Sequence, residues 1–293
     1  MADATFRYGD KEVILPMVEG TEKEAGVDIS HLAAETGLFT VDRGFGNTAE
    51  SGSAVSYIDG DAGILRYRGY PIEQLADKAS FLEVAYLLLY GELPSASELE
   101  EFSGSIVRHT LLREDMKHLF EAFPHNAHPM QILASATSAL ATYYPDALNP
   151  RDDAAVDISS RRLLAKMPTM IAWLFKYRMH QPYAYPRNDL DYPTNFLHMV
   201  FSVPSESYEA DPIVAAALNV LLILHADHGQ NCSATAVKLV GSGEANIFSS
   251  VAAGVLALSG PRHGGANQEV LEMLEEMAAS GGDVTHFVNR AKD

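Results

Sequence analysis

The chain has 293 residues, of which 47% are hydrophobic, so it is long enough to bury a large core and to form more than one domain. Its formal net charge is −18, from 21 basic and 39 acidic residues, and no Lys/Arg-rich run is present. This argues against sequence-general binding to nucleic acid, which needs cations that neutralise phosphates.

Cysteine usage and the apolar segments predict a soluble, cytoplasmic protein. The single cysteine, Cys232, excludes an intrachain disulfide and indicates a reducing compartment. Residues 1–7 contain neither the cationic region nor the apolar run of a signal peptide. The most apolar stretch, residues 213–226, is shorter than the about 20 residues that a membrane-spanning helix needs. We therefore expect no membrane anchor.

The first 58 residues are predicted to form a β-rich N-terminal segment. Short runs of strand-forming residues surround turns that contain glycine, which is typical of β-hairpins. Two hairpins are expected, from residues 5–8 with 11–15 and from residues 54–58 with 64–67.

After this segment the pattern becomes helical, so the predicted fold class is mainly α. Ser80 begins a capping box with Glu83, and residues 97–100 are interpreted as a second box. Residues 161–179 are expected to form a long helix that Pro168 kinks.

Three further helices are predicted towards the end of the chain. Asp211 caps a helix over residues 213–228, which is apolar almost all round and is therefore expected at the centre of the core. Residues 246–259 are rich in Ala, Ser and Gly, which favours close packing against a neighbouring helix or a second subunit. The third helix is expected over residues 265–279.

A first histidine motif, residues 225–231 (HADHGQN), lies at the predicted end of a helix. On one helix, His225 and His228 share a face because they are three positions apart. At the C-terminal end of that helix the dipole favours a protonated His228, suited to a carboxylate ligand. Asn231 and Ser233 add polar groups that can orient a ring. The alternative, which is favoured for an isolated HxxH, is a pair of satisfied core histidines.

A second motif, residues 260–268 (GPRHGGANQ), places His263 just before the N-terminus of a predicted helix. The helix dipole disfavours an imidazolium there, so we expect a neutral ring. Such a ring can donate an N–H to a carbonyl oxygen that becomes enolate-like. Gly264 and Gly265 are expected to clear space for a substrate and to leave their N–H groups available. The alternative is a capping histidine in a glycine turn.

Neither motif matches a common metal or nucleotide site. The HExxH spacing is absent, Cys232 is the only thiol, and no carboxylate besides Asp227 is near enough to complete a ligand set. A zinc-dependent hydrolase built on the three histidines is therefore the weakest alternative. No GxGxxG or P-loop pattern is present. We expect no metal and no resident cofactor.

Taken together, the motifs resemble citrate synthase in the form found in many bacteria. They run in the family's order across nearly the whole chain, which makes the resemblance specific. The shared stretches are residues 57–72 (YIDGDAGILRYRGYPI), 87–94 (LLLYGELP), 123–130 (FPHNAHPM) and the two histidine motifs.

The resemblance implies an acyltransferase that condenses acetyl-CoA with oxaloacetate and hydrolyses citryl-CoA to citrate and CoA, feeding the tricarboxylic acid cycle. It implies that His263 is the catalytic histidine, which holds the thioester carbonyl and stabilises its enol. By the same resemblance, His228 and His225 are expected to bind oxaloacetate. The residues expected behind these rings are Asn231, Ser233 and Asn267, and the resemblance implies that Ser233 helps to orient the ring of His263. Coenzyme A is part of the substrate and product, and the assembly is expected to be a homo-oligomer, at least a dimer.

The resemblance also implies a domain organisation. Residues 1–58 form the β-rich segment, residues 59–275 a large helical domain, and residues 276–293 the start of a small domain. The family's next motif, its catalytic aspartate and the arginines that bind oxaloacetate are not found before Asp293. We therefore expect a large-domain fragment that is inactive on its own.

Two positions depart from the family pattern. Gly229 stands where the family usually has Glu, and Arg262 where it usually has Leu. Two alternatives stay open beside citrate synthase. One is 2-methylcitrate synthase, which uses propionyl-CoA, and the other is a non-catalytic, dimerising remnant.

Overall fold

The computed structural model describes residues 3–281 and 284–292, in two compact units. The first unit ends at Ala54 and the second begins at Val55. The division precedes strand β5 because β5 pairs with the strand that follows it in the second unit. The domain boundaries expected after Ile58 and Glu275 stay predictions.

The first unit, as far as it is described, combines short antiparallel hairpins with short helices. β1 and β2 pair in register from Ala4 with Leu15 to Tyr8 with Lys11. Gly9 at their turn has a φ of 59°, which glycine adopts without strain. The first predicted hairpin is confirmed. The elements are β1 (Ala4–Tyr8), β2 (Lys11–Leu15), β3 (Met17–Glu19), β4 (Ala25–Val27), α1 (Leu32–Thr36) and the 3-10 helix η1 (Arg43–Phe45).

The second unit opens with a small antiparallel sheet. β5 (Ser56–Asp59) pairs with β6 (Ile64–Tyr67), and β6 pairs with β7 (Tyr70–Pro71). The second predicted hairpin is confirmed. Ser56 lies directly opposite Tyr67, so both side chains leave the same face of the hairpin.

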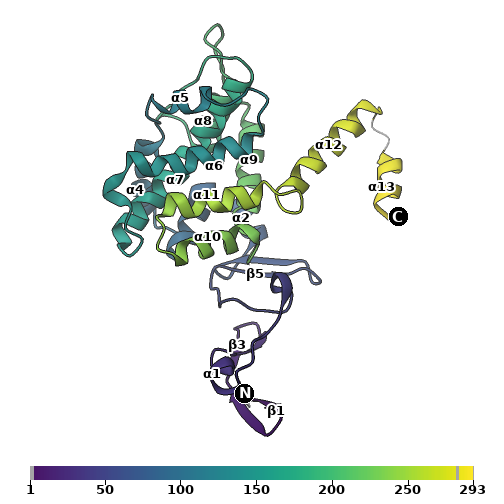
Figure 1. Cartoon of the computed structure of the whole chain (residues 1–293). Coiled ribbons are helices and arrows are strands. Elements are labelled where there is room, and N and C mark those ends of the chain that lie inside the picture. Colours follow the sequence, from purple (N-terminus) through teal and green to yellow (C-terminus); the bar gives the residue numbers. More distant parts are fainter. Residues whose placement is uncertain (1–2, 282–283, 293) are drawn as a thin grey trace. The chain divides into compact units, whose positions relative to one another are not determined.

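Helices make up the rest of the second unit, which confirms the mainly α fold class. α6, α11 and α10 lie side by side (Figure 1). In chain order the helices are α2 (Ile72–Lys78), α3 (Phe81–Tyr90), α4 (Ala96–His109), α5 (Met116–Glu121), α6 (Pro129–Ala139), η2 (Leu140–Tyr143), η3 (Pro145–Ala147), α7 (Asp153–Arg178), α8 (Tyr192–Phe201), α9 (Pro212–Leu224), α10 (Cys232–Ser242), α11 (Ile247–Leu258), α12 (Gly265–Ala279) and α13 (Val284–Lys292).

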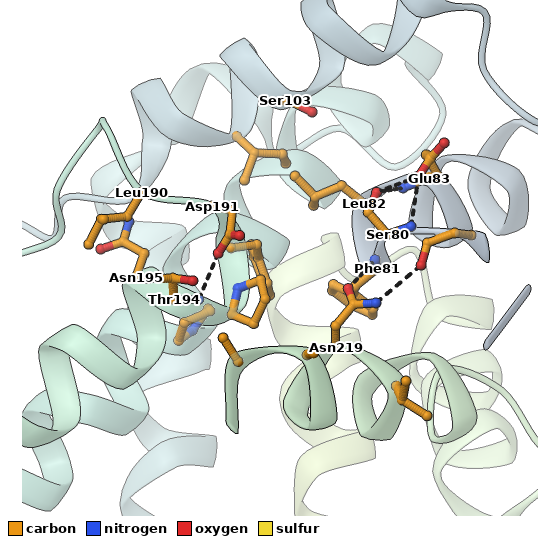
Figure 2. A pocket seen from close by; sticks show the side chains of 18 of the residues that line it. Ser80, Phe81, Leu82, Glu83, Ser103, Leu190, Asp191, Thr194, Asn195 and Asn219 are labelled. Atoms are coloured by element: carbon orange, nitrogen blue, oxygen red, sulfur yellow. Dashed lines mark hydrogen bonds between the residues drawn. The ribbon is translucent and has the colours of Figure 1, made fainter. Parts of the chain in front are cut away.

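Helix α3 begins and ends as the sequence predicts. The Ser80 hydroxyl accepts the N–H of Glu83, and the Glu83 carboxylate accepts the N–H of Ser80 at 2.7 Å (Figure 2). Gly91 closes the helix in the left-handed region, with a φ of 98°.

The second capping box lies two residues earlier than predicted. Ser95 and Glu98, rather than Ser97 and Glu100, cap α4. The pattern S-x-x-E occurs twice in overlapping register, and the earlier match adds two residues to the helix.

Helix α7 is continuous through Pro168 and begins at Asp153, earlier than predicted, because Asp152 caps it. Proline has no N–H, so the carbonyl of Leu164 lacks its helical donor. The Tyr192 hydroxyl of α8 donates to that carbonyl at 2.8 Å. Packing of α8 on α7 therefore replaces the missing hydrogen bond.

Helix α9 is less buried than its composition predicts. Asp211 caps it as expected, accepting the N–H of Ile213 at 2.8 Å. Within α9 only Ala215 and Ile223 are buried, whereas Ile213 is 77% exposed. The prediction that this helix lies at the centre of the core is therefore wrong for the second unit. No helix in the described ranges is long and apolar enough to cross a membrane.

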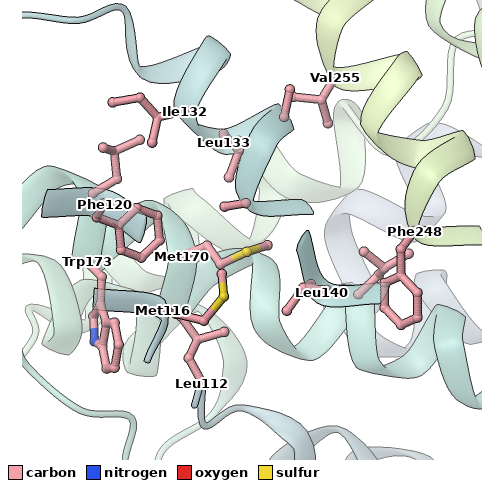
Figure 3. Close-up of a cluster of buried hydrophobic side chains, with 14 residues drawn as sticks. Leu112, Met116, Phe120, Ile132, Leu133, Leu140, Met170, Trp173, Phe248 and Val255 are labelled. Carbon is pink, nitrogen blue, oxygen red and sulfur yellow. The ribbon is translucent and has the colours of Figure 1, made fainter. Parts of the chain in front are cut away.

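A buried apolar cluster holds α5, α6, α7 and α11 together (Figure 3). Trp173 is fully buried, and its Nε1 donates to the carbonyl of Ala184 at 2.8 Å. The other large members are Leu112, Met116, Phe120, Ile132, Leu133, Leu140, Leu163, Met170, Leu174, Phe248 and Val255.

A second buried cluster fixes the β5–β6 hairpin against α2, α3 and α9. Its members are Tyr67, Ile72, Leu75, Val84, Leu87 and Ile223. This cluster places Tyr67 beneath the first histidine motif.

Candidate functional site

The first histidine motif follows helix α9 rather than lying on it. α9 ends at Leu224, and His225 is its C-cap, with φ −100° and ψ 3°. The ring of His225 is exposed, and its Nδ1 donates to the carbonyl of Leu221 at 2.8 Å. The prediction that His225 and His228 share one helix face is therefore wrong. The argument that the dipole of this helix acts on His228 fails with it.

His228 instead lies just before helix α10, whose N-cap is Asn231. The Asn231 Oδ1 accepts the N–H of Ala234 at 3.0 Å, which turns its Nδ2 towards His228. Nδ2 lies 3.3 Å from the Nε2 of His228. An amide nitrogen only donates, so Nε2 accepts and Nδ1 is the nitrogen that carries a proton. The cap of α10 thus selects the tautomer of His228.

His263 lies in a tight turn between α11 and α12. The backbone N–H of His263 donates to the carbonyl of Gly260 at 3.0 Å. The N–H of Gly264 donates to Leu258 at 3.0 Å, and that of Gly265 donates to Gly260 at 3.1 Å. The expectation that these glycine N–H groups are available to a substrate is therefore wrong, because the turn uses both.

Ser233 connects helix α10 to the ring of His263. Its Oγ lies 2.8 Å from the Nε2 of His263 and 2.9 Å from the carbonyl of Gly254. Helix α10 approaches α11 closely at Gly254, which has no side chain: a Cβ there would lie 2.8 Å from Val237 Cγ2 and 3.5 Å from the carbonyl oxygen of Ser233. The small residue in α11 therefore serves close packing against α10, as predicted.

The single proton of the Ser233 hydroxyl has two acceptors. If it is donated to Gly254, then Oγ accepts a proton from Nε2 of His263, and Nδ1 becomes the acceptor. If it is donated to Nε2, then Nδ1 carries the proton and can donate to a ligand. The second state is the one that suits an enol-forming reaction.

The two histidine motifs meet in space. The rings of His228 and His263 are 5.7 Å apart between centroids, in a T-shaped arrangement with an interplanar angle of 61°. Asn231 contacts the first of these rings and Ser233 the second, so the two imidazoles and their polar partners lie together. We refer to His228, Asn231, Ser233 and His263 as the histidine cluster.

Two other candidates, His225 and Asn267, lie outside the histidine cluster in the described part of the chain. The ring of His225 is bound to its own helix. Asn267 is exposed on α12, and its backbone N–H donates to Gly264 at 3.1 Å. Arg262, a departure from the family pattern, is also exposed. Among the described residues, no three His, Cys, Asp or Glu side chains gather in a metal-binding geometry.

Two hydroxyl groups beneath the first motif were missed by the sequence reasoning. The Tyr67 hydroxyl lies 3.0 Å from the carbonyl of Ile223 and 2.9 Å from that of Asp227, and it accepts the N–H of Asp227 at 3.2 Å. Ser56 donates to Oδ1 of Asp227, which also accepts the N–H of Gly229 at 2.8 Å. Burial raises the pKa of Tyr67, so this hydroxyl keeps its proton. The one local signal was the D-x-G spacing, which favours an Asx turn.

A separate cavity of about 850 Å³ lies between the start of α3, α4, α8 and α9 (Figure 2). No member of the histidine cluster lines it. Its polar side chains serve the fold: Asn219 accepts the N–H of Phe81 at 2.7 Å and donates to the carbonyl of Ala79 at 3.1 Å. Asp191 accepts the N–H of Thr194 at 2.9 Å.

Comparison with known proteins agrees with the geometry. The family model "Citrate synthase, C-terminal domain" matches residues 44–293. Citrate synthase 1 of Mycobacterium tuberculosis is 54% identical over 290 residues, and citrate synthase of Corynebacterium glutamicum is 51% identical over 291 residues. Each match covers 99% of this chain and 67% of the relative, so the chain spans about two thirds of their length.

Solved structures of similar fold are also citrate synthases. The enzyme of Pyrobaculum aerophilum has a TM-score of 0.70 at 30% identity, covering 89% of this chain and 62% of that structure. A ternary complex of the Thermoplasma acidophilum enzyme with carboxymethyl coenzyme A and oxaloacetate has a TM-score of 0.74 at 25% identity, covering 81% and 61%. The family match over most of the chain and the relatives above half identity show that this chain belongs to the citrate synthase family.

Proposed function

We propose that this chain supplies the two histidines of a citrate synthase active site, which condenses acetyl-CoA with oxaloacetate and hydrolyses citryl-CoA to citrate and CoA. The observation that carries the proposal is the histidine cluster, in which Ser233 contacts His263 at 2.8 Å and the His228 ring lies beside it. Membership of the family supports the same activity.

His263 is proposed to stabilise the enol of acetyl-CoA. When the Ser233 hydroxyl donates its hydrogen bond to Nε2, the Nδ1–H of His263 donates to the thioester carbonyl oxygen. Negative charge develops on that oxygen as the methyl group loses a proton, so the hydrogen bond strengthens in the transition state. The resemblance assigns removal of this proton to an aspartate in a motif that these 293 residues do not contain.

His228 is proposed to bind oxaloacetate. Its Nε2 is engaged by Asn231, so its Nδ1–H is the group that donates to a carboxylate or keto oxygen. His225 stays a candidate second oxaloacetate residue, through Nε2, because its Nδ1 is bound to Leu221. Asn267 stays a candidate residue behind the site. Imidazoles supply the proposed chemistry, so we propose no metal and no resident cofactor.

The protein is proposed to work as a homo-oligomer in the cytoplasm. Large apolar side chains are exposed on α9 and α10, including Ile213 at 77% and Leu239 at 72%. Exposed apolar surface of this kind favours association with another chain. The exposed free thiol of Cys232 fits a reducing compartment.

The test combines a CoA-release assay with oxaloacetate titration followed by NMR of the histidine rings. We expect oxaloacetate to shift the His228 ring signals of the 293-residue protein and expect His228→Ala to weaken binding at least tenfold. His118→Ala, which changes an exposed histidine of α5, is the control and should bind as the parent does. An unchanged affinity in His228→Ala would refute the oxaloacetate assignment.

The assay with acetyl-CoA also tests the expectation that these 293 residues do not turn over on their own. CoA release above background, lost in His263→Ala, would contradict that expectation and support the proposed role of His263. Release with propionyl-CoA in preference to acetyl-CoA would favour the 2-methylcitrate alternative, whereas the matched relatives are citrate synthases.

A further inference from the structure

We propose that the hydroxyl groups of Tyr67 and Ser56 position His228 for its ligand by ending helix α9 at Leu224, before the helix reaches His228. Both act through the backbone and side chain of Asp227, so they are positioning residues. The inference rests on the proposed role of His228 in binding a dicarboxylate.

Tyr67 takes the place of one helical hydrogen bond. If α9 continued, the N–H of Asp227 would donate to the carbonyl of Ile223, four residues before it. Instead the N–H donates to the Tyr67 hydroxyl at 3.2 Å, and that hydroxyl lies 3.0 Å from the Ile223 carbonyl and 2.9 Å from the Asp227 carbonyl. The Ile223 carbonyl accepts the N–H of Ala226 at 3.2 Å, in a tighter turn than that of an α-helix. The hydroxyl is therefore inserted between donor and acceptor, and the backbone leaves the helix before His228.

Ser56 holds the side-chain carboxylate of Asp227. It donates to Oδ1, and the same oxygen accepts the N–H of Gly229 at 2.8 Å. The carboxylate thus closes a turn over residues 227–229, with His228 at its centre and Gly229 in the left-handed region at φ 81°. A residue other than glycine is strained in that conformation.

The two hydroxyls come from one cross-strand pair. Ser56 and Tyr67 are register partners on β5 and β6. From this one position on the hairpin, Tyr67 hydrogen-bonds the backbone of Asp227 and Ser56 its side chain. Tyr67 is fully buried, which fixes the position of its ring in the core. The hairpin therefore fixes the position of residues 225–231, which have no regular secondary structure of their own.

Loss of either hydroxyl should move the His228 ring. Without the Tyr67 hydroxyl, the N–H of Asp227 is free to return to Ile223, and α9 can extend towards His228. Extension turns the His228 ring away from Asn231, which otherwise donates to its Nε2 at 3.3 Å. Small displacements of a binding group cost affinity steeply because its hydrogen bonds depend on distance and angle.

The experiment compares Tyr67→Phe and Ser56→Ala with Tyr192→Phe in the 293-residue protein. Tyr192 is the matched control, because its hydroxyl also donates to a helical carbonyl, that of Leu164, and it lies outside the histidine cluster. The readouts are the backbone carbon shifts of residues 225–228, the ring signals of His228 and the affinity for oxaloacetate, each measured well below the thermal midpoint.

We expect Tyr67→Phe to give residues 225–228 helical backbone shifts, and expect both hairpin variants to move the His228 ring signals and weaken oxaloacetate binding about tenfold. Tyr192→Phe should lower the thermal midpoint and leave all three readouts unchanged. The same backbone shifts, ring signals and affinity in both hairpin variants as in the parent would overturn the proposal.

The design separates this inference from the proposed function. If the parent protein binds no oxaloacetate, the proposed function fails, and the ligand-free shifts of residues 225–228 and of the His228 ring still decide the positioning role. If Tyr67→Phe does not fold, Ser56→Ala decides alone, because Ser56 is half-buried and its loss leaves the core intact.

Discussion

The turn that contains His263 requires glycine at position 264, because Leu258 lies too close for a side chain there. A Cβ on Gly264 would lie 2.4 Å from the carbonyl oxygen of Leu258 and 2.8 Å from Leu258 Cδ1. The first distance is far inside van der Waals contact with backbone, which cannot move without breaking the hydrogen bond from Gly264 to Leu258. Glycine at this position therefore fixes where His263 emerges from the end of α11.

Gly264→Ala should consequently destabilise the protein by about 2 kcal/mol or more, in the range of overpacked core substitutions. Chemical denaturation measures the change. Gly104→Ala is the control, since its Cβ would meet only the flexible end of Arg108, at 3.3 Å, and alanine is the better helix former. Equal stability of Gly264→Ala and the parent would show that the turn relaxes without cost.

At the scale of single residues, the local pattern identified the histidine motifs, and only the family resemblance predicted the contact of Ser233 with His263, which is confirmed. Ser233 and His263 are 30 positions apart, and their contact depends on α10 and α11 turning back against each other at Gly254. Tyr67 and Ser56 lie about 160 and 171 positions from Asp227. Nothing in the local pattern around either residue indicates such a partner.

Helix ends were predictable where local side chains determine them. The box of Ser80 with Glu83 and the cap at Asp211 are encoded within four residues, and both are confirmed. The end of α9 was not predictable, because the group that interrupts it, Tyr67, belongs to a distant strand. Tertiary contacts of this kind override an apolar helical pattern.

Pro168 and Tyr192 provide a quantitative test at the level of helix packing. Tyr192→Phe leaves the carbonyl of Leu164 without a donor and should cost about 1–2 kcal/mol of stability. In a Pro168→Ala background, residue 168 regains its N–H and can bond Leu164 as an ordinary helix does. The cost of Tyr192→Phe should then fall by at least half, measured as a double-mutant cycle by denaturation. Equal costs in both backgrounds would contradict the compensation.

Lys166 of α7 should make stability depend on pH. Burial is the main cause that lowers its pKa to about 8 from an ordinary 10.5, and Arg162 and Arg113 lower it further. Below pH 8 the lysine is charged in both states and its burial penalty is fully present. Between pH 8 and 10.5 the folded state releases its proton while the unfolded state keeps it, so the free energy of unfolding rises with pH.

Comparison with Lys166→Met isolates this effect. The parent should gain about 1–2 kcal/mol relative to the variant between pH 7.5 and 9.5, since one unit of pKa shift corresponds to about 1.4 kcal/mol. Denaturation curves at several pH values provide the measurement. Parallel pH dependences of parent and variant would show that the folded protein keeps Lys166 charged.

At the scale of the whole molecule, the mainly α class followed from composition and periodicity, and the family followed from motif order. The exposed surfaces could not be anticipated. Exposed apolar side chains gather on α9, α10 and α12, with Ile213, Leu239 and Leu271 each more than 60% exposed. Apolar surface on this scale is usual where another chain or domain binds.

Helix α11 was predicted to pack against a neighbouring helix or a second subunit, and its residues divide into two groups. Ala252 and Gly254 are buried within the chain, against the neighbouring helices α10 and α6. Ala253 is only half-buried, and Leu256 is 50% exposed. The small residues therefore serve intrachain packing on one side and leave another side accessible to a partner.

Ala253→Phe should shift the protein towards monomer, because a bulky ring on a closely packed surface keeps a second copy of the helix at a distance. Ala96→Phe, at the exposed first position of α4, is the control and should leave the oligomeric state unchanged. Light scattering coupled to size-exclusion chromatography gives the mass of each variant. If Ala253→Phe elutes with the parent's mass and melts at the parent's temperature, the contact between subunits lies elsewhere. A lower melting temperature at unchanged mass would assign Ala253 to intrachain packing alone.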